Sequence, residues 1–270
     1  WRSIRKGNRA RKATNKLISI DCDKNSSETS KTTTMDQTTV SCAPDSVEIQ
    51  LPHVEQTLSW DCGVSCVAMV LSPEQRSDLL LNRDQIGREE GYHQSTWTID
   101  LCYLLRRFGV DHVYATVTLG VNPMFQKECY YKKSLQWDFQ RVEDRFRDAA
   151  SHGLTVCQRS TTVAELLDHL GRGGPVIVLV DHGQLHCDSC QKNKVVAKMA
   201  GVFARYAPYQ GHYIVLCGYK LKERKFLYRN PSKSDRLCSV TFETLDRARK
   251  RLGTDEDVIF VNASSQDVRS

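Results

Sequence analysis

An α+β fold is predicted for this chain, because a helix comes early and strands gather late. A short apolar helix directly follows Cys62. The last three predicted strands are rich in β-branched and aromatic residues and follow one another, which indicates an antiparallel sheet. A helix at the start of a domain and a sheet at its end are typical of α+β proteins.

Several of the expected helices carry recognisable start or stop signals. Ser95 and Thr96 are expected to cap a helix that Gly109 ends, and Thr162 with Glu165 forms a capping-box pattern. The expected helices cover 63–71, 97–108, 138–152, a segment after Thr162 and a segment that begins at Thr241. The expected strands cover 47–51, 112–119, 175–181, 212–219, 225–228 and 257–262. Residues 120–137 have no clear period and are expected to form a long loop over the site.

The composition divides the chain into three parts. Residues 1–45 are rich in Ser, Thr, Asn, Lys and Arg and poor in aromatic residues, so they are predicted to be a disordered basic tail. The folded domain is predicted to span 46–263, and 264–270 to form a second polar tail. Seven basic and no acidic residues lie between Arg2 and Lys16. We interpret this run as a solvated tail and do not expect nucleic acid to be a partner.

Composition also narrows the class of protein. A hydrophobic share of 40% and a charged share of 26% are ordinary for a soluble globular protein. No long apolar run predicts a membrane span, and no charged start with an apolar segment predicts secretion. Eleven scattered cysteines suit a reducing compartment better than a disulfide scaffold. The expected location is the cytoplasm, with the nucleus as a second one.

Four residues with catalytic chemistry follow one another at suggestive spacing. Gln56 precedes Cys62 by six residues. His212 follows Cys62 by 150 residues and precedes Asn230 by 18. Papain-like cysteine hydrolases place an oxyanion glutamine, a nucleophile, a base and an orienting residue in this order. Each residue alone has a structural explanation, namely a buried thiol, a structural histidine or an Asn-Pro turn, but these do not account for the order of the set.

The predicted roles follow from the chemistry of a thiol nucleophile. The start of a helix is expected to lower the pKa of Cys62, since it offers free amides and the positive end of the dipole. His212 is the expected base, and Asn230 is expected to orient its ring. Gln56 would donate to the oxyanion beside the backbone N–H of Cys62. Asp61 would oppose thiolate formation, and we interpret it as structural.

A second cluster has the spacing of a metal site. His186, Cys187 and Cys190 supply three potential zinc ligands, and Cys157 or Cys238 are candidates for a fourth. The favoured interpretation is a loop with free thiols, because no second Cys-x-x-Cys follows. The chain is therefore expected to need no cofactor, with a structural zinc as the alternative.

Several motifs together resemble the guanylyl-cyclase-domain-containing protein 1 family. The resemblance covers roughly 50–262 and rests on Trp60-Asp-Cys-Gly63, Ser95-Thr-Trp-Thr-Ile-Asp-Leu101, Leu185-His-Cys-Asp-Ser-Cys190, Tyr209-Gln-Gly-His-Tyr-Ile-Val-Leu216, Asn230-Pro231 and Gly253-Thr-Asp-Glu-Asp257. That family is similar in turn to papain-like peptidase domains that cleave double-glycine leaders. The resemblance implies a nucleophilic role for Cys62, with His212, Asn230 and Gln56 as its partners. Those peptidases have Asp where this chain has Asn230.

Three functions are therefore expected in order. The first is a cysteine hydrolase that acts on a peptide or amide substrate. The second, implied by the family name, is a guanylyl cyclase that forms cyclic GMP from GTP, although the sequence has no P-loop and no recognisable pair of metal-binding carboxylates. The third is a catalytically silent adaptor that binds protein partners.

Overall fold

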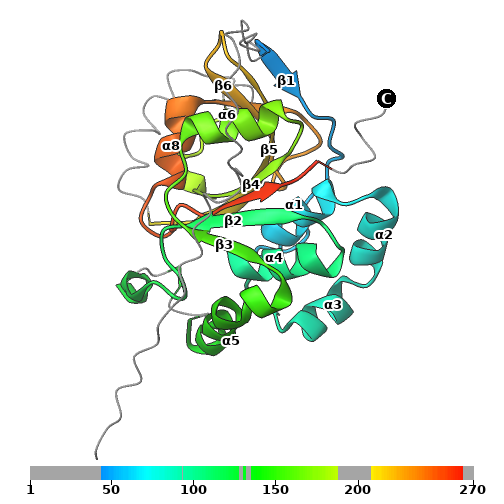
Figure 1. Ribbon diagram of the computed structural model, residues 1–270, viewed down its shortest axis with the longest axis vertical. Coiled ribbons are helices and arrows are strands. Elements are labelled where there is room, and N and C mark those ends of the chain that lie inside the picture. Colours follow the sequence, from blue (N-terminus) through cyan, green and yellow to red (C-terminus); the bar gives the residue numbers. More distant parts are fainter. Residues whose placement is uncertain (1–43, 93, 128–129, 132–134, 188–207, 264–270) are drawn as a thin grey trace, which may run out of the picture. The chain divides into compact units, whose positions relative to one another are not determined.

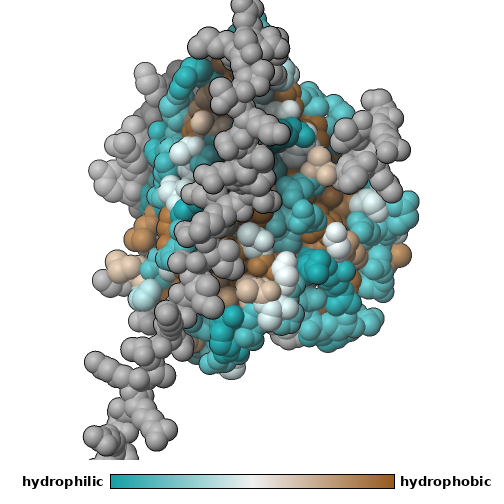
Figure 2. Space-filling model, in the orientation of Figure 1, coloured by the Kyte–Doolittle hydropathy of each residue, from teal (hydrophilic) through white to brown (hydrophobic). Residues whose placement is uncertain are grey.

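A computed structural model describes residues 44–263 except 93, 128–129, 132–134 and 188–207 (Figure 1). The predicted tails at 1–45 and 264–270 thus lie almost entirely outside the described residues. No helix of the described part is both long enough and apolar enough to cross a membrane. On the face in Figure 2 the coloured surface is largely hydrophilic and is interrupted by small apolar areas.

The centre of the described part is a mixed sheet of eight strands, in the order β3-β2-β8-β4-β5-β6-β7 with β1 paired to β5. The strands are β1 (Ser46–Glu48), β2 (His112–Thr116), β3 (Thr155–Gln158), β4 (Val176–Asp181), β5 (Gly211–Lys220), β6 (Lys225–Arg229), β7 (Cys238–Thr241) and β8 (Val258–Val261). The pair β2 and β3 is parallel, whereas the other pairs are antiparallel. The antiparallel arrangement predicted for the last strands is therefore confirmed, although β4 lies between β8 and β5.

Helices cover both faces of this sheet. The helices are α1 (Cys62–Val70), α2 (Pro73–Leu81), α3 (Arg83–Glu90), α4 (Thr98–Arg107), α5 (Leu135–Asp148), α6 (Val163–Gly171) and α8 (Phe242–Arg249). In Figure 1, α6 and α8 lie on one side of the sheet and α1 to α5 on the other. Two separate apolar cores result, one beneath α1 and α4 and one beneath α6 and α8. The predicted α+β class is confirmed, with the cysteine helix early and the strands that carry His212 and Asn230 late.

Local signals explain where some of these helices begin. At α6 the Thr162 hydroxyl accepts from the Glu165 N–H while the Glu165 carboxylate accepts from Thr162, so the predicted capping box forms. The predicted cap at Ser95 and Thr96 is wrong. α4 begins at Thr98, and the Asp100 carboxylate accepts from the Trp97 N–H (2.9 Å).

Four elements have no counterpart in the prediction: α2, α3, β3 and β7. α2 and α3 are strongly polar, so they show no apolar stripe, and the capping pair Ser72 and Gln75 was the available signal. α5 begins at Leu135 and ends at Asp148, and a short 3-10 helix completes the segment predicted as helical up to residue 152. Phe139 of this helix is 45% exposed.

Candidate active site

The loop that precedes Cys62 is organised around a buried carboxylate. Asp61 is 1% exposed and accepts hydrogen bonds from the backbone N–H groups of Thr57 (3.2 Å) and Leu58 (3.0 Å). Its other partner is Arg83, whose guanidinium forms an ion pair with it at 2.9 Å. These contacts support the structural role expected for Asp61, since a buried carboxylate with several donors fixes the backbone around it.

Cys62 begins α1 and packs directly against strand β5. It is 6% exposed. The close approach depends on Gly63, because a Cβ at this position would lie 2.9 Å from the Leu101 side chain and 3.1 Å from Tyr213. Cys66, one helical turn later, is fully buried in the core.

The expected low pKa of the Cys62 thiol is not what the structure shows. Burial raises this pKa, and the Asp61 carboxylate raises it further, while hydrogen bonds from the backbone of Tyr213 and Gly63 lower it only in part. Burial therefore outweighs the backbone hydrogen bonds at the start of this nine-residue helix. At rest, Cys62 is a neutral thiol.

His212 and Asn230 form a buried hydrogen-bonded pair. His212 lies on β5 and Asn230 directly follows β6, and 2.9 Å separates the imidazole Nε2 from the Asn230 Oδ1. The backbone N–H of Ser232 also donates to this oxygen (3.0 Å), as does the Ser232 hydroxyl (2.9 Å). An atom that accepts from a backbone N–H is an oxygen, so the Nε2 of His212 must carry the proton. The Nδ1 of His212 consequently bears a lone pair.

The electrostatics keep this imidazole neutral. Burial lowers the pKa of His212 to about 4, although the hydrogen bond to Asn230 opposes the shift. The ring of His182 lies 4.8 Å away and lowers the pKa slightly more. No hydrogen bond joins the Cys62 thiol to the described atoms of His212. The structure therefore shows a neutral thiol and a neutral imidazole on packed elements, without direct contact.

Gln56 is tied to the same region through its backbone. Its N–H donates to the carbonyl of Pro231 (2.9 Å), and the His53 Nε2 lies 3.1 Å from the carbonyl of Asn230. One hydrogen of the Gln56 side-chain amide goes to the carbonyl of Leu58 (2.8 Å). The amide nitrogen has a second hydrogen, which remains available to another acceptor.

A large open cavity of about 630 Å³ lies beside Cys62. Aromatic side chains dominate its walls: Trp60, Trp97, Tyr130, Tyr131, Trp137 and Tyr213. Residues 120–137, expected to form a loop over the site, do supply three of these rings, although they contain a 3-10 helix and the start of α5. The aromatic lining was not predicted, and the unusual density of Trp and Tyr in this segment was the signal that pointed to it.

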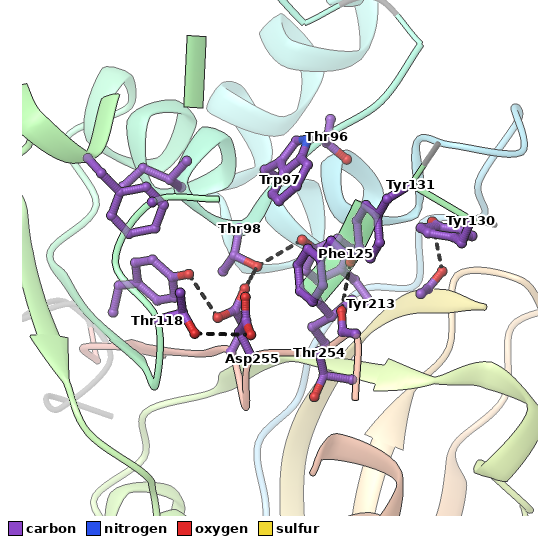
Figure 3. Close-up of a pocket in the computed structure, with 18 residues that line it drawn as sticks. Thr96, Trp97, Thr98, Thr118, Phe125, Tyr130, Tyr131, Tyr213, Thr254 and Asp255 are labelled. Atoms are coloured by element: carbon purple, nitrogen blue, oxygen red, sulfur yellow. Dashed lines mark hydrogen bonds between the residues drawn. The ribbon is translucent and has the colours of Figure 1, made fainter. Parts of the chain in front are cut away.

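A second, much smaller cavity lies deeper and contains two carboxylates (Figure 3). Asp257 accepts from Thr98 (2.5 Å) and from the Tyr114 hydroxyl (2.8 Å), and Thr98 also pairs with the Tyr213 hydroxyl (2.9 Å). Burial and the neighbouring Asp255 raise the pKa of Asp257 to about 7. With a volume of about 30 Å³ the cavity has room for a water molecule but not for a nucleotide.

The structure does not test the predicted zinc site. Cys190 lies outside the described residues. Among the residues that are described, no group of three His, Cys, Asp or Glu side chains is placed to hold a metal ion. Cys187 and Cys238 are buried, and Cys157 is disulfide-bonded, so its thiol is not the available ligand that was expected.

A cysteine at the start of a helix, packed on a strand with a hydrogen-bonded His–Asn pair, is the arrangement found in a class of cysteine hydrolases. Residues 51–261 match a family model described as guanylylate cyclase. The chain is 36% identical over 220 residues to Guanylyl cyclase 1 of Arabidopsis thaliana. The aligned residues make up 81% of this chain and 78% of that protein. The chain therefore belongs to the guanylylate cyclase family.

A comparison of structures gives a more distant similarity. A crystal structure of a C39-like peptidase from Bacillus anthracis matches 82% of this chain and 98% of its own length. The sequence identity is 14% and the TM-score is 0.47.

Proposed function

We propose that the chain is a cysteine hydrolase that cleaves amide bonds, with Cys62 as nucleophile and His212 as general base. The observation that carries this proposal is the hydrogen bond network at Asn230. The Asn230 oxygen accepts from Nε2 and so keeps the proton of the neutral His212 ring on that nitrogen, which leaves the Nδ1 lone pair as a base for the thiol.

The neutral resting state defines the first step. As the Cys62 sulfur bonds to the substrate carbonyl carbon, the thiol proton passes to the Nδ1 of His212. The carbonyl oxygen becomes an oxyanion, which the second hydrogen of the Gln56 amide and the Cys62 N–H stabilise. N–H groups in the first turn of a helix have no acceptor within that helix, so the Cys62 N–H is suited to this role.

The remaining steps return the protein to its starting state. The carbon–nitrogen bond breaks, and the amine leaves with the proton that His212 received. Water then attacks the thioester on Cys62 while His212 again accepts a proton. The carbon–sulfur bond breaks, the proton on His212 passes to the Cys62 sulfur, and the carboxylic acid product leaves. Asn230 keeps the imidazole in one orientation and one tautomer throughout.

The test is acylation of Cys62 by an activated ester such as p-nitrophenyl acetate. The rate is measured from the release of p-nitrophenolate, and mass spectrometry of the Cys62 peptide identifies the acylated residue. Cys62→Ala should abolish acylation, and His212→Ala should slow it by about 10²–10⁴-fold, the usual contribution of a general base. Cys66→Ala, one turn later in the same helix, is the matched control and should react like the wild type. Equal rates in the wild type and in His212→Ala would refute the proposal.

The name of the relative in Arabidopsis supports a second candidate, the formation of cyclic GMP from GTP. Metal-dependent production of cyclic GMP that persists in Cys62→Ala would favour it. The small size of the cavity around Asp255 and Asp257 argues against a nucleotide at those carboxylates. If neither acylation nor cyclisation is detected, the third candidate remains, an adaptor that binds protein partners.

A further inference from the structure

We infer that the cavity beside Cys62 binds a bulky apolar side chain, preferably an aromatic one, next to the amide bond that Cys62 attacks. This inference rests on the proposed function and specifies its substrate class. Three independent features of the cavity lead to it: a rigid aromatic wall, a compensated charge and an exposed tryptophan at the rim.

The wall is rigid because its rings hold one another. Phe125 and Tyr131 are stacked with 4.3 Å between ring centroids and an interplanar angle of 3°, and Trp97 lies 5.1 Å from Tyr131. The Trp97 indole N–H donates to Asp138 (3.1 Å), and the Tyr131 hydroxyl donates to the carbonyl of Gly253 (2.7 Å). The two polar ends are therefore satisfied while the ring faces remain apolar. A surface fixed in advance loses little entropy when a ligand binds.

The one charged side chain in the described lining of the cavity is neutralised by an ion pair with an arginine. Asp138 is the one charged side chain among the described residues that line it, and it is 7% exposed. Its Oδ1 accepts from Arg141 (2.7 Å), and its Oδ2 accepts from Trp97 and from the Ser95 hydroxyl. A charged substrate group would lose its hydration here, and no unpaired charge of the described lining is available to form an ion pair with it. The described part of the lining thus favours neutral groups.

The rim carries an aromatic residue that has little protein around it. Trp137, near the start of α5, lines the cavity and is 78% exposed. Tyr130 also lines it and is 46% exposed. Large exposed aromatic side chains beside a concave site are typical of ligand-binding surfaces, since burying them on binding is favourable. A substrate ring in the cavity would remove part of both side chains from water.

The test uses N-acetyl dipeptidyl acyloxymethyl ketones, which alkylate an active-site thiol irreversibly with loss of a carboxylate. Phe, Leu, Gly, Lys or Glu is placed in turn at each of the two residues, and the rate of Cys62 labelling is measured by mass spectrometry. At one position we expect Phe and Leu to react about tenfold faster or more than Gly, because burying such a side chain changes affinity by a factor of about 10 to 100. Lys and Glu should react no faster than Gly.

Two variants on α5 provide a matched comparison. Trp137→Ala should remove most of the preference for Phe, so that the ratio of the Phe rate to the Gly rate falls to about twofold or less. Phe139→Ala removes another exposed aromatic residue of the same helix that does not line the cavity, and it should retain the preference. Labelling of Cys62 at the same rate by all side chains would overturn the inference and leave the proposed function intact.

Binding without chemistry separates the two proposals. N-acetylphenylalaninamide and N-acetylglycinamide are titrated into Cys62→Ala, and chemical shifts of the tryptophan side chains report binding. Saturable binding of the Phe compound alone, lost in the Cys62→Ala, Trp137→Ala double variant, supports the inference even if no ketone labels Cys62. Absence of such binding overturns it.

Discussion

The imidazole ring of His182 packs edge-on against the ring of His212, with 4.8 Å between the centroids and an interplanar angle of 80°. His182 belongs to a short 3-10 helix directly after β4, and its N–H donates to the carbonyl of Gln210 (2.8 Å). Burial is the main cause of the lowered pKa of His212, and the charge of a protonated His182 lowers this pKa further.

Replacing His182 should therefore change the pH at which His212 becomes protonated. In His182→Ala, water reaches the His212 imidazole, and its pKa should rise from about 4 toward its ordinary value of 6.5. His182→Phe keeps the packing and should leave the pKa near that of the wild type. NMR titration of the His212 ring protons measures both variants. An unchanged pKa in His182→Ala would show that this contact does not exclude water.

The acidic limb of the activity profile should report His212 directly. Only the neutral imidazole accepts the thiol proton, so kcat/KM should increase as pH rises through about 4 and then level off. The plateau should extend above neutral pH, because burial raises the pKa of the Cys62 thiol. The measurement is the rate of Cys62 acylation from about pH 3 to about pH 9, with circular dichroism as the control for folding. A limb near 6.5 would contradict the buried state of His212.

Asn230→Asp should move this limb in a known direction. A carboxylate beside the imidazole favours the imidazolium, so the pKa of His212 should rise and acylation at acidic pH should fall. At alkaline pH the variant should stay active, because the carboxylate still accepts from the Nε2. Ser232→Ala is the matched control, since it retains the backbone N–H that orients residue 230. A large loss of activity at all pH values in Asn230→Asp would argue that a neutral amide is required.

Asp257 should make the stability of the protein depend on pH. Its pKa of about 7 exceeds the ordinary value of 3.8, so between these values the folded state binds more protons than the unfolded state. Stability is therefore fully present below about pH 4 and is lost as pH rises to about 7, by up to about 4 kcal/mol. Asp257→Asn should remove this dependence, as measured by urea unfolding at about pH 5 and about pH 8. The exposed Asp84→Asn is the control, and the same pH slope in wild type and Asp257→Asn would contradict the assignment.

The sequence predicted those parts of the fold that have strong local signals. The apolar helix after Cys62 and the strand that begins near His212 are confirmed, since a continuous apolar run has few alternatives to burial. The polar helices α2 and α3 were not predicted, because they pack on neighbouring helices through few apolar side chains. The α4 cap differed because the helix begins at Thr98 with Trp97 at its N-cap, and Asp100 in the first turn accepts from the Trp97 N–H.

In the candidate site too, the sequence shows the order and spacing of residues but not the properties that depend on tertiary packing. The order and spacing of Gln56, Cys62, His212 and Asn230 were visible in the sequence, and their roles remain predictions. The pKa of Cys62 was expected to fall, but this depends on burial, which no spacing reveals. The aromatic cavity likewise forms from segments far apart in the chain.

Gly63 has a consequence for how members of this family can differ in activity. The first turn of α1 lies against Leu101 and Tyr213 because residue 63 has no side chain. An added Cβ there would lie 2.9 Å from the Leu101 side chain and 3.1 Å from that of Tyr213, so either these side chains shift or the first turn of α1, with the proposed nucleophile Cys62, moves away from β5. An inactive relative could therefore arise by one substitution outside the catalytic set, and an inventory of catalytic residues alone would misclassify it as an enzyme.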